Sequence, residues 1–335
     1  MMIFARLLPI YLLFFCVQGY AQDLHFSQFY HNPLNLTPAA TGVHSGDVRA
    51  SGLYRSQWTS VPVSYQTFAG SVDWKAINRG SNVIGIGFLL QHDQAGDAKL
   101  RWTQVGATLS VVHALGAQQG ISAGFGMAFV QRSFDINGLT FQNQWTGDLF
   151  DHNLPSKEQF GRSSGIKPSF SAGLMWFMHA NGSRNEVKVG IGAHHLNKPA
   201  INFSDDLSFR LPVRVTINAE CSLQTSDLLD IVAFAAVQQL STSREVIAGV
   251  GLRRILDSGP GRALAVRATM ALRAGDALIP AIQLERNNWV FGLSYDWNIS
   301  KFDIATKGRG GFELAAVYQI LPAPPVKSFK TCPVF

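Results

Sequence analysis

Beyond residue 21, the sequence contains no apolar run that approaches the roughly 20 residues a membrane-spanning helix needs, which excludes helical spans. Charge is also scarce, because Asp, Glu, Lys and Arg make up 15% of the chain, whereas soluble domains carry about 25%. The net charge of +6 comes from scattered side chains, without the basic cluster that a nucleic-acid groove requires. We therefore expect no nucleic-acid partner.

Cysteine is rare as well: the chain has 3, and only Cys221 and Cys332 lie beyond residue 21. An exported protein could oxidise such a pair. Cys221, however, falls in the middle of an expected strand, on the side that should face lipid, and Cys332 falls in the C-terminal tail. We expect both thiols to be unpaired.

The first 21 residues have the three parts of a secretory signal peptide. Arg6 precedes an apolar run from Leu7 to Val17, and the small-x-small triplet Gly19-Tyr20-Ala21 offers a cleavage site before Gln22. A retained anchor is the alternative, but the run is too short to span a bilayer as a helix. We expect residues 1–21 to be removed and the mature protein to be exported.

A period of two dominates the sequence from Val48 to Ile320. One clear segment alternates Val213, Val215, Ile217 and Ala219 with Arg214, Thr216, Asn218 and Glu220. Successive strand residues point to opposite faces, so such a segment has one apolar and one polar face. The segments reach about 8 to 13 residues, which suits tilted membrane strands of about 9–11 residues with Trp and Tyr near their ends. The pattern predicts an all-β protein, a transmembrane antiparallel β-barrel of the outer membrane.

About fourteen such segments can be counted, an even number as is usual for single-chain barrels. They are roughly 48–55, 67–74, 82–93, 103–115, 120–132, 167–179, 186–195, 213–223, 229–238, 245–256, 263–273, 277–286, 289–299 and 311–320. Short connections alternate with long ones, and short turns belong on the periplasmic side. This predicts a barrel over residues 48–320, a tail over 321–335 and both termini in the periplasm. The longest connection, about residues 133–166, is expected to be functional or disordered.

Residues 22–47 do not alternate. Their Asn32-Pro33 and Thr37-Pro38 pairs block ladder pairing and bias the preceding residues away from helix. Large apolar side chains nevertheless need burial here, namely Phe26, Phe29, Tyr30, Leu34 and Leu36. We expect an irregular but ordered segment packed at the periplasmic mouth of the barrel, with a disordered linker as the alternative.

Residue patterns that would indicate catalysis are weak. Glycine pairs such as GIGF, GFGM (from Gly124), GIGA (which includes Gly192) and GVGL lie inside strands and are interpreted as small luminal residues, not as a nucleotide-binding loop. His194 and His195 are adjacent, so they should lie on opposite faces of a strand and should not ligate one metal. An outer-membrane lipase would need a lipid-facing serine, yet no G-x-S-x-G elbow occurs. We expect no enzyme, no catalytic residue, no metal and no cofactor.

Charged residues on the expected luminal face are mixed in sign, which we interpret as an ion-paired interior, with a selectivity filter as the alternative. They are Arg49, Lys188, Arg214, Glu220, Arg253, Arg267, Arg273, Glu285, Asp296 and Glu313. Large inward residues such as Leu53 and Phe234 argue for a filled lumen. A passive porin for small solutes, which needs an open lumen, is the second functional hypothesis.

Several blocks of sequence recur in order in a known family. The first is FSQFYHNPLNLTPAATG (26–42), in which Thr37 stands where the family usually has Asn and Thr41 where it has Ala. The others are YRSQW (54–58), HHLNKP (194–199, with Lys198 for the usual Gln), LPVR (211–214), YDWNISKF (295–302), GGFELAAVY (310–318) and CPVF (332–335). In these blocks the chain resembles the PorP/SprF family of type IX secretion system membrane proteins.

The resemblance implies a non-catalytic outer-membrane β-barrel that assists export and surface attachment of proteins carrying a type IX C-terminal sorting domain, including gliding adhesins. It also implies contact with outer-membrane lipid and with the periplasmic ring or peptidoglycan-linked components of that machine. The same blocks supply the candidate residues for partner binding or for a plug: Phe26, Ser27, Gln28, Tyr30, Asn32, Pro33, Pro38, Gly42, Tyr54, Arg55, Gln57, Trp58, His194 and His195.

Overall fold

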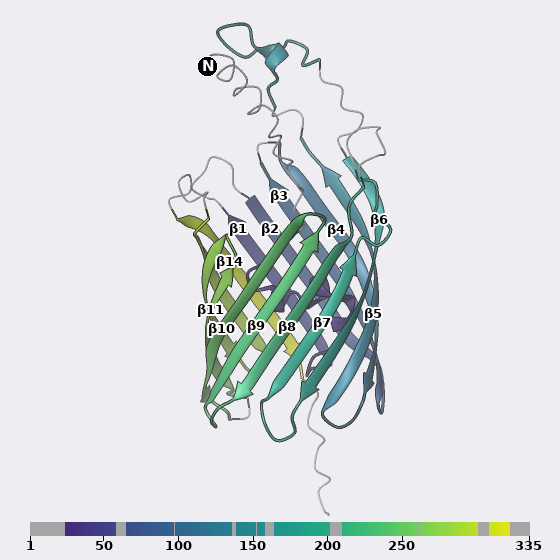
Figure 1. The fold of residues 1–335 in the computed structure, drawn as a ribbon, viewed down its shortest axis with the longest axis vertical. Helices are drawn as coiled ribbons and strands as arrows, with labels where there is room; N and C mark the ends of the chain where they lie inside the picture. The colour runs from purple at the N-terminus through teal and green to yellow at the C-terminus, as the bar shows by residue number, and fades with distance from the viewer. Residues whose placement is uncertain are drawn as a thin grey trace, which may run out of the picture.

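The computed structural model describes residues 24–57, 65–96, 98–135, 139–151, 153–157, 164–201, 210–259, 261–300 and 308–321. Within them, fourteen antiparallel strands form one closed barrel (Figure 1), as the alternation predicted. The strands are β1 (Val48–Gln57), β2 (Tyr65–Arg79), β3 (Asn82–Ala95), β4 (Leu100–Ala114), β5 (Gln119–Ser133), β6 (Ser164–His179), β7 (Glu186–His194), β8 (Arg214–Gln224), β9 (Leu229–Leu240), β10 (Ser243–Asp257), β11 (Leu264–Arg273), β12 (Ala277–Arg286), β13 (Trp289–Asn298) and β14 (Arg309–Ile320).

Each strand pairs with its neighbours in the sequence, and the barrel closes where β1 pairs with β14. That seam runs without interruption from Val48 opposite Ile320 to Gln57 opposite Gly311. Closure leaves no strand edge unpaired, which a sheet in hydrocarbon requires because lipid cannot satisfy backbone N–H and C=O groups.

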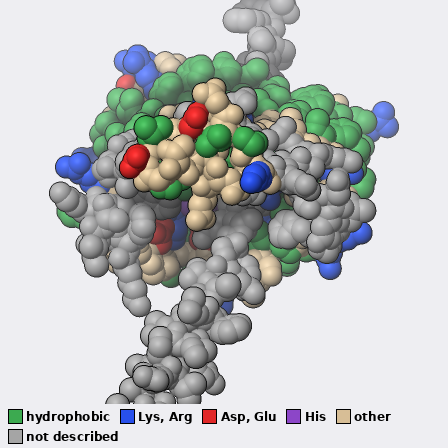
Figure 2. Space-filling model, turned by 90° about the horizontal axis from the view of Figure 1, so that it is seen from above, with side chains coloured by type: hydrophobic (Ala, Val, Ile, Leu, Met, Phe, Trp, Pro, Cys, Tyr) green, Lys and Arg blue, Asp and Glu red, His purple; other side chains and the backbone are tan. Residues whose placement is uncertain are grey.

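The two faces of the wall follow the predicted alternation. On β8, Ile217 is 49% exposed on the outside, whereas its neighbour Thr216 is 0% exposed inside the barrel. On β13 the same outward face carries Trp289, Phe291, Leu293, Tyr295 and Trp297. Viewed along the barrel, hydrophobic side chains gather around the perimeter (Figure 2). The exposed apolar belt is the surface that a barrel presents to lipid.

Connections after even-numbered strands are short, such as 80–81 and 287–288, whereas those after β1, β5, β7 and β13 are longer. We call the two ends of the barrel the short-turn end and the long-connection end. Several strands extend beyond their predicted bounds; β2, expected over 67–74, continues to Arg79. The ladder continues past the apolar belt because backbone pairing does not require apolar side chains.

The N-terminal segment contains no strand in its described part. It consists of a 3-10 turn η2 (Phe29–His31), a single helical turn α2 (Pro33–Leu36) and a second 3-10 turn η3 (Pro38–Ala40). Prolines begin both α2 and η3, where their missing N–H would be unpaired in any case. Figure 1 shows this segment, in purple, inside the barrel wall. Among the described residues, no helix is long and apolar enough to cross a membrane.

Candidate functional site

Residues 24–47, hereafter the plug, fill the lumen. Four of the apolar side chains that were expected to need burial are buried, namely Phe26, Phe29, Leu34 and Leu36. Phe29 and Leu36 pack in one cluster with Phe234 of β9, and Phe26 packs in another with Leu53 of β1. Burying a large apolar side chain stabilises a fold by about 1.5–3 kcal/mol, which offsets the cost of ordering this short segment. The lumen is therefore filled by packed side chains along the length of the plug.

Tyr30 is the fifth of these side chains and is half-buried. Its hydroxyl accepts a hydrogen bond from Gln283 Nε2 at 2.7 Å. The Arg267 guanidinium lies 5.9 Å from the centre of its ring, within reach of a cation–π contact. Tyr30 therefore joins the apolar packing of the plug to polar groups on β11 and β12.

The first attachment of the plug is a carboxylate that binds its backbone. The N–H groups of Ser27 and Gln28 donate to the two Glu313 oxygens, at 2.8 and 2.7 Å. The Ser27 hydroxyl donates to Asp296 at 2.6 Å. Hydrogen bonds to an ionised acceptor are about twice as strong as neutral ones. Two strands next to the barrel seam, β13 and β14, thus hold the start of the plug.

Two arginines neutralise this buried cluster. Arg55 and Arg273 each donate to Asp296 Oδ2 at 2.8 Å. Arg273 also donates to the Ser27 hydroxyl at 2.7 Å, and Arg55 donates to the carbonyl of His25 at 2.9 Å. An ion-paired interior was predicted for Arg273, Asp296 and Glu313, and the structure shows that their partners include plug residues. Removing one member of such a buried set leaves an uncompensated charge.

The second attachment lies at α2 and at the residue that follows it. Arg214 of β8 donates to the backbone carbonyl and side-chain oxygen of Asn35, at 2.8 and 3.0 Å. The hydroxyl of Thr37 donates to the carbonyl of Ile191 at 3.0 Å and also accepts from the backbone of Ala39. Thr37, one of the departures from the family motif, therefore caps η3 and binds the wall.

The third attachment lies near the C-terminal end of the plug. Gly42, at a φ of +71° that suits glycine, donates its N–H to Asp73 at 2.7 Å. Asp73 is paired with Arg49, which also donates to the Ala40 carbonyl at 3.1 Å. Thr41 shares a 2.7 Å hydrogen bond with Thr108. The plug is thus held on β13 and β14, on β7 and β8, and on β2 and β4, around the circumference.

Luminal glycines let the plug backbone touch the wall. A β-carbon at Gly124 would fall on the carbonyl of Pro38, and one at Gly192 would fall on the carbonyl oxygen of Leu36. Both glycines belong to the pairs that were interpreted as small luminal residues. The structure adds the reason for their size, because any side chain at these positions would occupy the space of the plug.

His194 and His195 do not lie on opposite faces, and that expectation was wrong. Strand β7 ends at His194, and His195 turns with a φ of +59°, so both side chains are buried. His194 Nε2 donates to the Leu36 carbonyl at 3.1 Å. His195 Nδ1 lies 2.8 Å from the Ser169 hydroxyl. The alternation rule failed because it holds only while the chain remains in a strand.

The plug also brings histidine rings near carboxylates of the wall. The His25 ring lies 3.8 Å from the Glu245 carboxylate, and the His44 ring lies 3.4 Å from the Asp73 carboxylate.

The plug passes through the barrel along its length and is not limited to the rim where it was expected. His25 contacts Arg55 and Glu245, which lie near the long-connection ends of β1 and β10. Asp47 lies at the short-turn end, where its N–H donates to the Ile320 carbonyl at 2.7 Å. The described chain thus enters the lumen at the long-connection end and leaves it at the short-turn end.

The remaining candidate residues lie on β1 or directly after it, and their side chains do not share one face of the barrel wall. Arg55 binds the plug, Tyr54 faces outward, and Gln57 is the last residue of β1. Trp58 lies outside the described residues. Sequence reasoning missed the glycine contacts, and it did not connect the luminal charges to the plug. The plug residues 26–42 and some of the wall residues that bind them, namely Arg55, His194, Arg214, Asp296 and Glu313, lie in the blocks that carried the family resemblance, which was the available signal.

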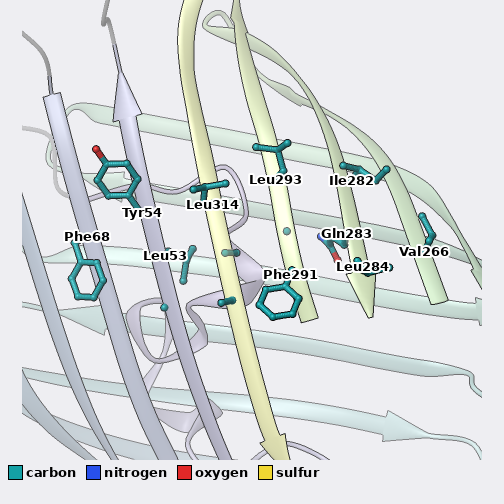
Figure 3. A pocket seen from close by; sticks show the side chains of 14 residues that line it. Leu53, Tyr54, Phe68, Val266, Ile282, Gln283, Leu284, Phe291, Leu293 and Leu314 are labelled. Atoms are coloured by element: carbon teal, nitrogen blue, oxygen red, sulfur yellow. The ribbon is translucent and has the colours of Figure 1, made fainter. Parts of the chain in front are cut away.

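A hollow of about 620 Å³ lies on the outer face of the wall over β1, β2 and β11–β14 (Figure 3). The small residues Gly52 and Ala316 lie between larger outward side chains, including Tyr54, Phe68 and Phe291. Because these side chains belong to the exposed apolar belt, we assign the hollow to the lipid-facing surface.

Other candidate chemistry is sparse in the described part of the chain. No group of three or more His, Cys, Asp or Glu side chains that could hold a metal ion occurs there. Cys221 is a free cysteine among the described residues, whereas Cys332 and the signal peptide lie outside them, so the expectation of two unpaired thiols stays a prediction.

Several solved structures are similar to this chain. The TodX deltaS2S3 mutant monoaromatic hydrocarbon channel has a TM-score of 0.49 and 9% identity, over 86% of this chain and 94% of that chain. The CymD monoaromatic hydrocarbon channel has a TM-score of 0.45 and 7% identity, over 91% and 96%. A Pseudomonas aeruginosa FadL homologue has a TM-score of 0.42 and 10% identity, over 84% and 92%. Similarity at this level carries no argument.

No curated protein matches the chain. The model of one family, described as type IX secretion system membrane protein PorP/SprF, matches residues 18–318. The match contains the plug and every strand except the last two residues of β14, and the CPVF block lies beyond it. Because the match spans most of the sequence, the chain belongs to the PorP/SprF family of type IX secretion system membrane proteins.

Proposed function

We propose that the chain is a non-enzymatic component of the type IX secretion and gliding machinery that assists export and surface attachment of proteins with a C-terminal sorting domain. Family membership supports the machinery, and the closed barrel with an apolar belt supports the outer membrane. The observation that carries the proposal is the plugged lumen, because a packed interior suits a protein that holds partners at the membrane.

The passive porin is the competing function, and the plug argues against it. Phe29, Leu36 and their neighbours fill space that a solute would need. Purified protein in planar bilayers should therefore show no steady conductance, whereas a variant lacking residues 26–42 should conduct. Steady, large conductance from the intact protein would favour the porin.

We further propose that the short-turn end faces the periplasm, where the ring or peptidoglycan-linked components lie, and that the long connections face outward. The expectation of a terminus in the periplasm stays a prediction for the C-terminal side, whereas we propose that the N-terminal side lies at the outward-facing end. Ile320 at the short-turn end agrees with it for the C-terminal side. His25 at the long-connection end argues against it for the N-terminal side.

The test in cells is a gene deletion complemented with variants. Loss of the gene should abolish surface display of proteins with the sorting domain, and the intact gene should restore it. Complementation by the variant without residues 26–42 then asks whether export needs the plug. Unchanged display in the deletion strain would refute the proposed function. A neighbouring gene that encodes a very large secreted protein with a sorting domain would identify the partner to follow.

A further inference from the structure

The connection between β5 and β6 has an ordered structure of its own. We call its residues 141–151 and 153–156 the finger. It contains a 3-10 turn η4 (Gln142–Gln144) and a β-bridge between Trp145 and Phe150. The Asp151 N–H donates to the Gln144 carbonyl at 2.9 Å. The Gln144 side chain is buried and donates to the Leu154 carbonyl at 2.9 Å. The finger therefore has a defined shape before any partner binds.

The tip of the finger exposes large apolar side chains. Trp145 is 46% exposed, Leu149 60% and Phe150 45%, and the rings of Trp145 and Phe150 lie 4.9 Å apart. Figure 1 shows this connection, in teal, beyond the ends of β5 and β6, and Figure 2 shows hydrophobic and acidic side chains, with a basic one beside them, near the centre of that end. The tip is thus separate from the belt on the strands. Exposed clusters of this kind mark interaction sites, and aromatic residues dominate their binding energy.

The charge at the tip of the finger is acidic. Residues 139–156 contain Asp148 and Asp151, and the first basic side chain is Lys157, which is exposed just beyond the finger. Asp151 holds the backbone and side chain of Asn153, at 2.9 and 3.0 Å, whereas Asp148 is exposed beside Leu149. An apolar tip with an exposed carboxylate complements a partner that carries an apolar side chain next to a basic one.

We propose that the finger binds an exported polypeptide through a segment in which an apolar residue adjoins Lys or Arg. This deepens the proposed function and rests on it, because the partner is a protein that the secretion machinery delivers to the long-connection end. A lipid surface fits less well, since anionic headgroups attract basic segments and repel carboxylates. A second copy of the chain also fits less well, because a symmetric contact would place Asp148 near its own copy.

The test is photo-crosslinking in living, secreting cells. p-Benzoylphenylalanine replaces Leu149 in one strain and Leu196 in the control; Leu196 is an exposed leucine just after β7 at the same end of the barrel. Light should join position 149, but not position 196, to an exported protein. Mass spectrometry of the joined peptide should show Lys or Arg next to the attached apolar residue.

Variants then test the chemistry of the contact. Asp148→Lys should reduce the adduct by about tenfold or more, and the double variant Trp145→Ser with Phe150→Ser should do the same, as expected when a central contact is lost. Asp148→Asn, which removes the charge without reversing it, should have an intermediate effect. Unchanged heat-modifiable migration on unboiled gels shows that the barrel of each variant is folded.

The outcomes separate this inference from the proposed function. An adduct with lipid, with a second copy of the chain or with a segment lacking basic residues would overturn the inference, as would equal yields at positions 149 and 196. If gene deletion abolishes surface display but these variants leave both adduct and display unchanged, only the finger contact is wrong. If deletion leaves display intact, the proposed function itself fails.

Discussion

Gly192→Ala tests whether the plug and the wall are in direct contact. The added β-carbon would fall on the Leu36 carbonyl oxygen and within 3.1 Å of the Leu36 carbonyl carbon and of Thr37 Cα. These are backbone atoms of a buried segment, which cannot rotate away as a flexible side chain could. Adding a methyl group to a packed interior costs about 1–3 kcal/mol, while alanine in a strand recovers about 0.5–1 kcal/mol relative to glycine. We expect a net loss of about 1–2 kcal/mol.

The assay has two readouts, both in detergent. The temperature at which half of the protein migrates as unfolded on unboiled gels should fall, and limited proteolysis should cut the displaced plug faster. Gly52→Ala is the matched control: Gly52 lies in a strand too, but an added β-carbon meets no atom within 4 Å. That variant should be as stable as the unaltered protein or slightly more so. Identical melting and identical cleavage of the two variants would refute direct contact at Gly192.

Two further predictions concern the rest of the plug. Asp296→Asn leaves two buried arginines without their shared carboxylate. The free energy of unfolding of the barrel should therefore fall by about 3–5 kcal/mol. An unchanged melting midpoint on unboiled gels would contradict the buried cluster. An epitope tag placed after Ala21 should bind antibody on intact cells, because the chain enters the lumen at the long-connection end, and detection only after lysis would support a periplasmic N-terminus.

The sequence by itself determined the barrel, because alternate residues of each strand face lipid and lumen and therefore alternate between apolar and polar or small side chains. Trp289, Phe291 and Leu293 could be assigned to the lipid side without coordinates, and the count of fourteen strands followed from repeating that assignment. Strand ends were less certain, as at Arg79, since the backbone ladder continues where the apolar pattern stops. The order of the plug could also be expected from its crowded apolar side chains and its prolines.

Only the tertiary structure decided what the plug touches. Ser27 and Glu313 are 286 residues apart in sequence, and closure of the barrel brings β14 beside β1 and over the start of the plug. No local pattern carries that contact. The burial of both His194 and His195 depended on a turn at the end of β7, and the need for glycine at position 192 depended on a carbonyl from another part of the chain. Alternation reports which face a residue occupies, whereas its partner across the lumen depends on how the closed wall and the plug fit together in three dimensions.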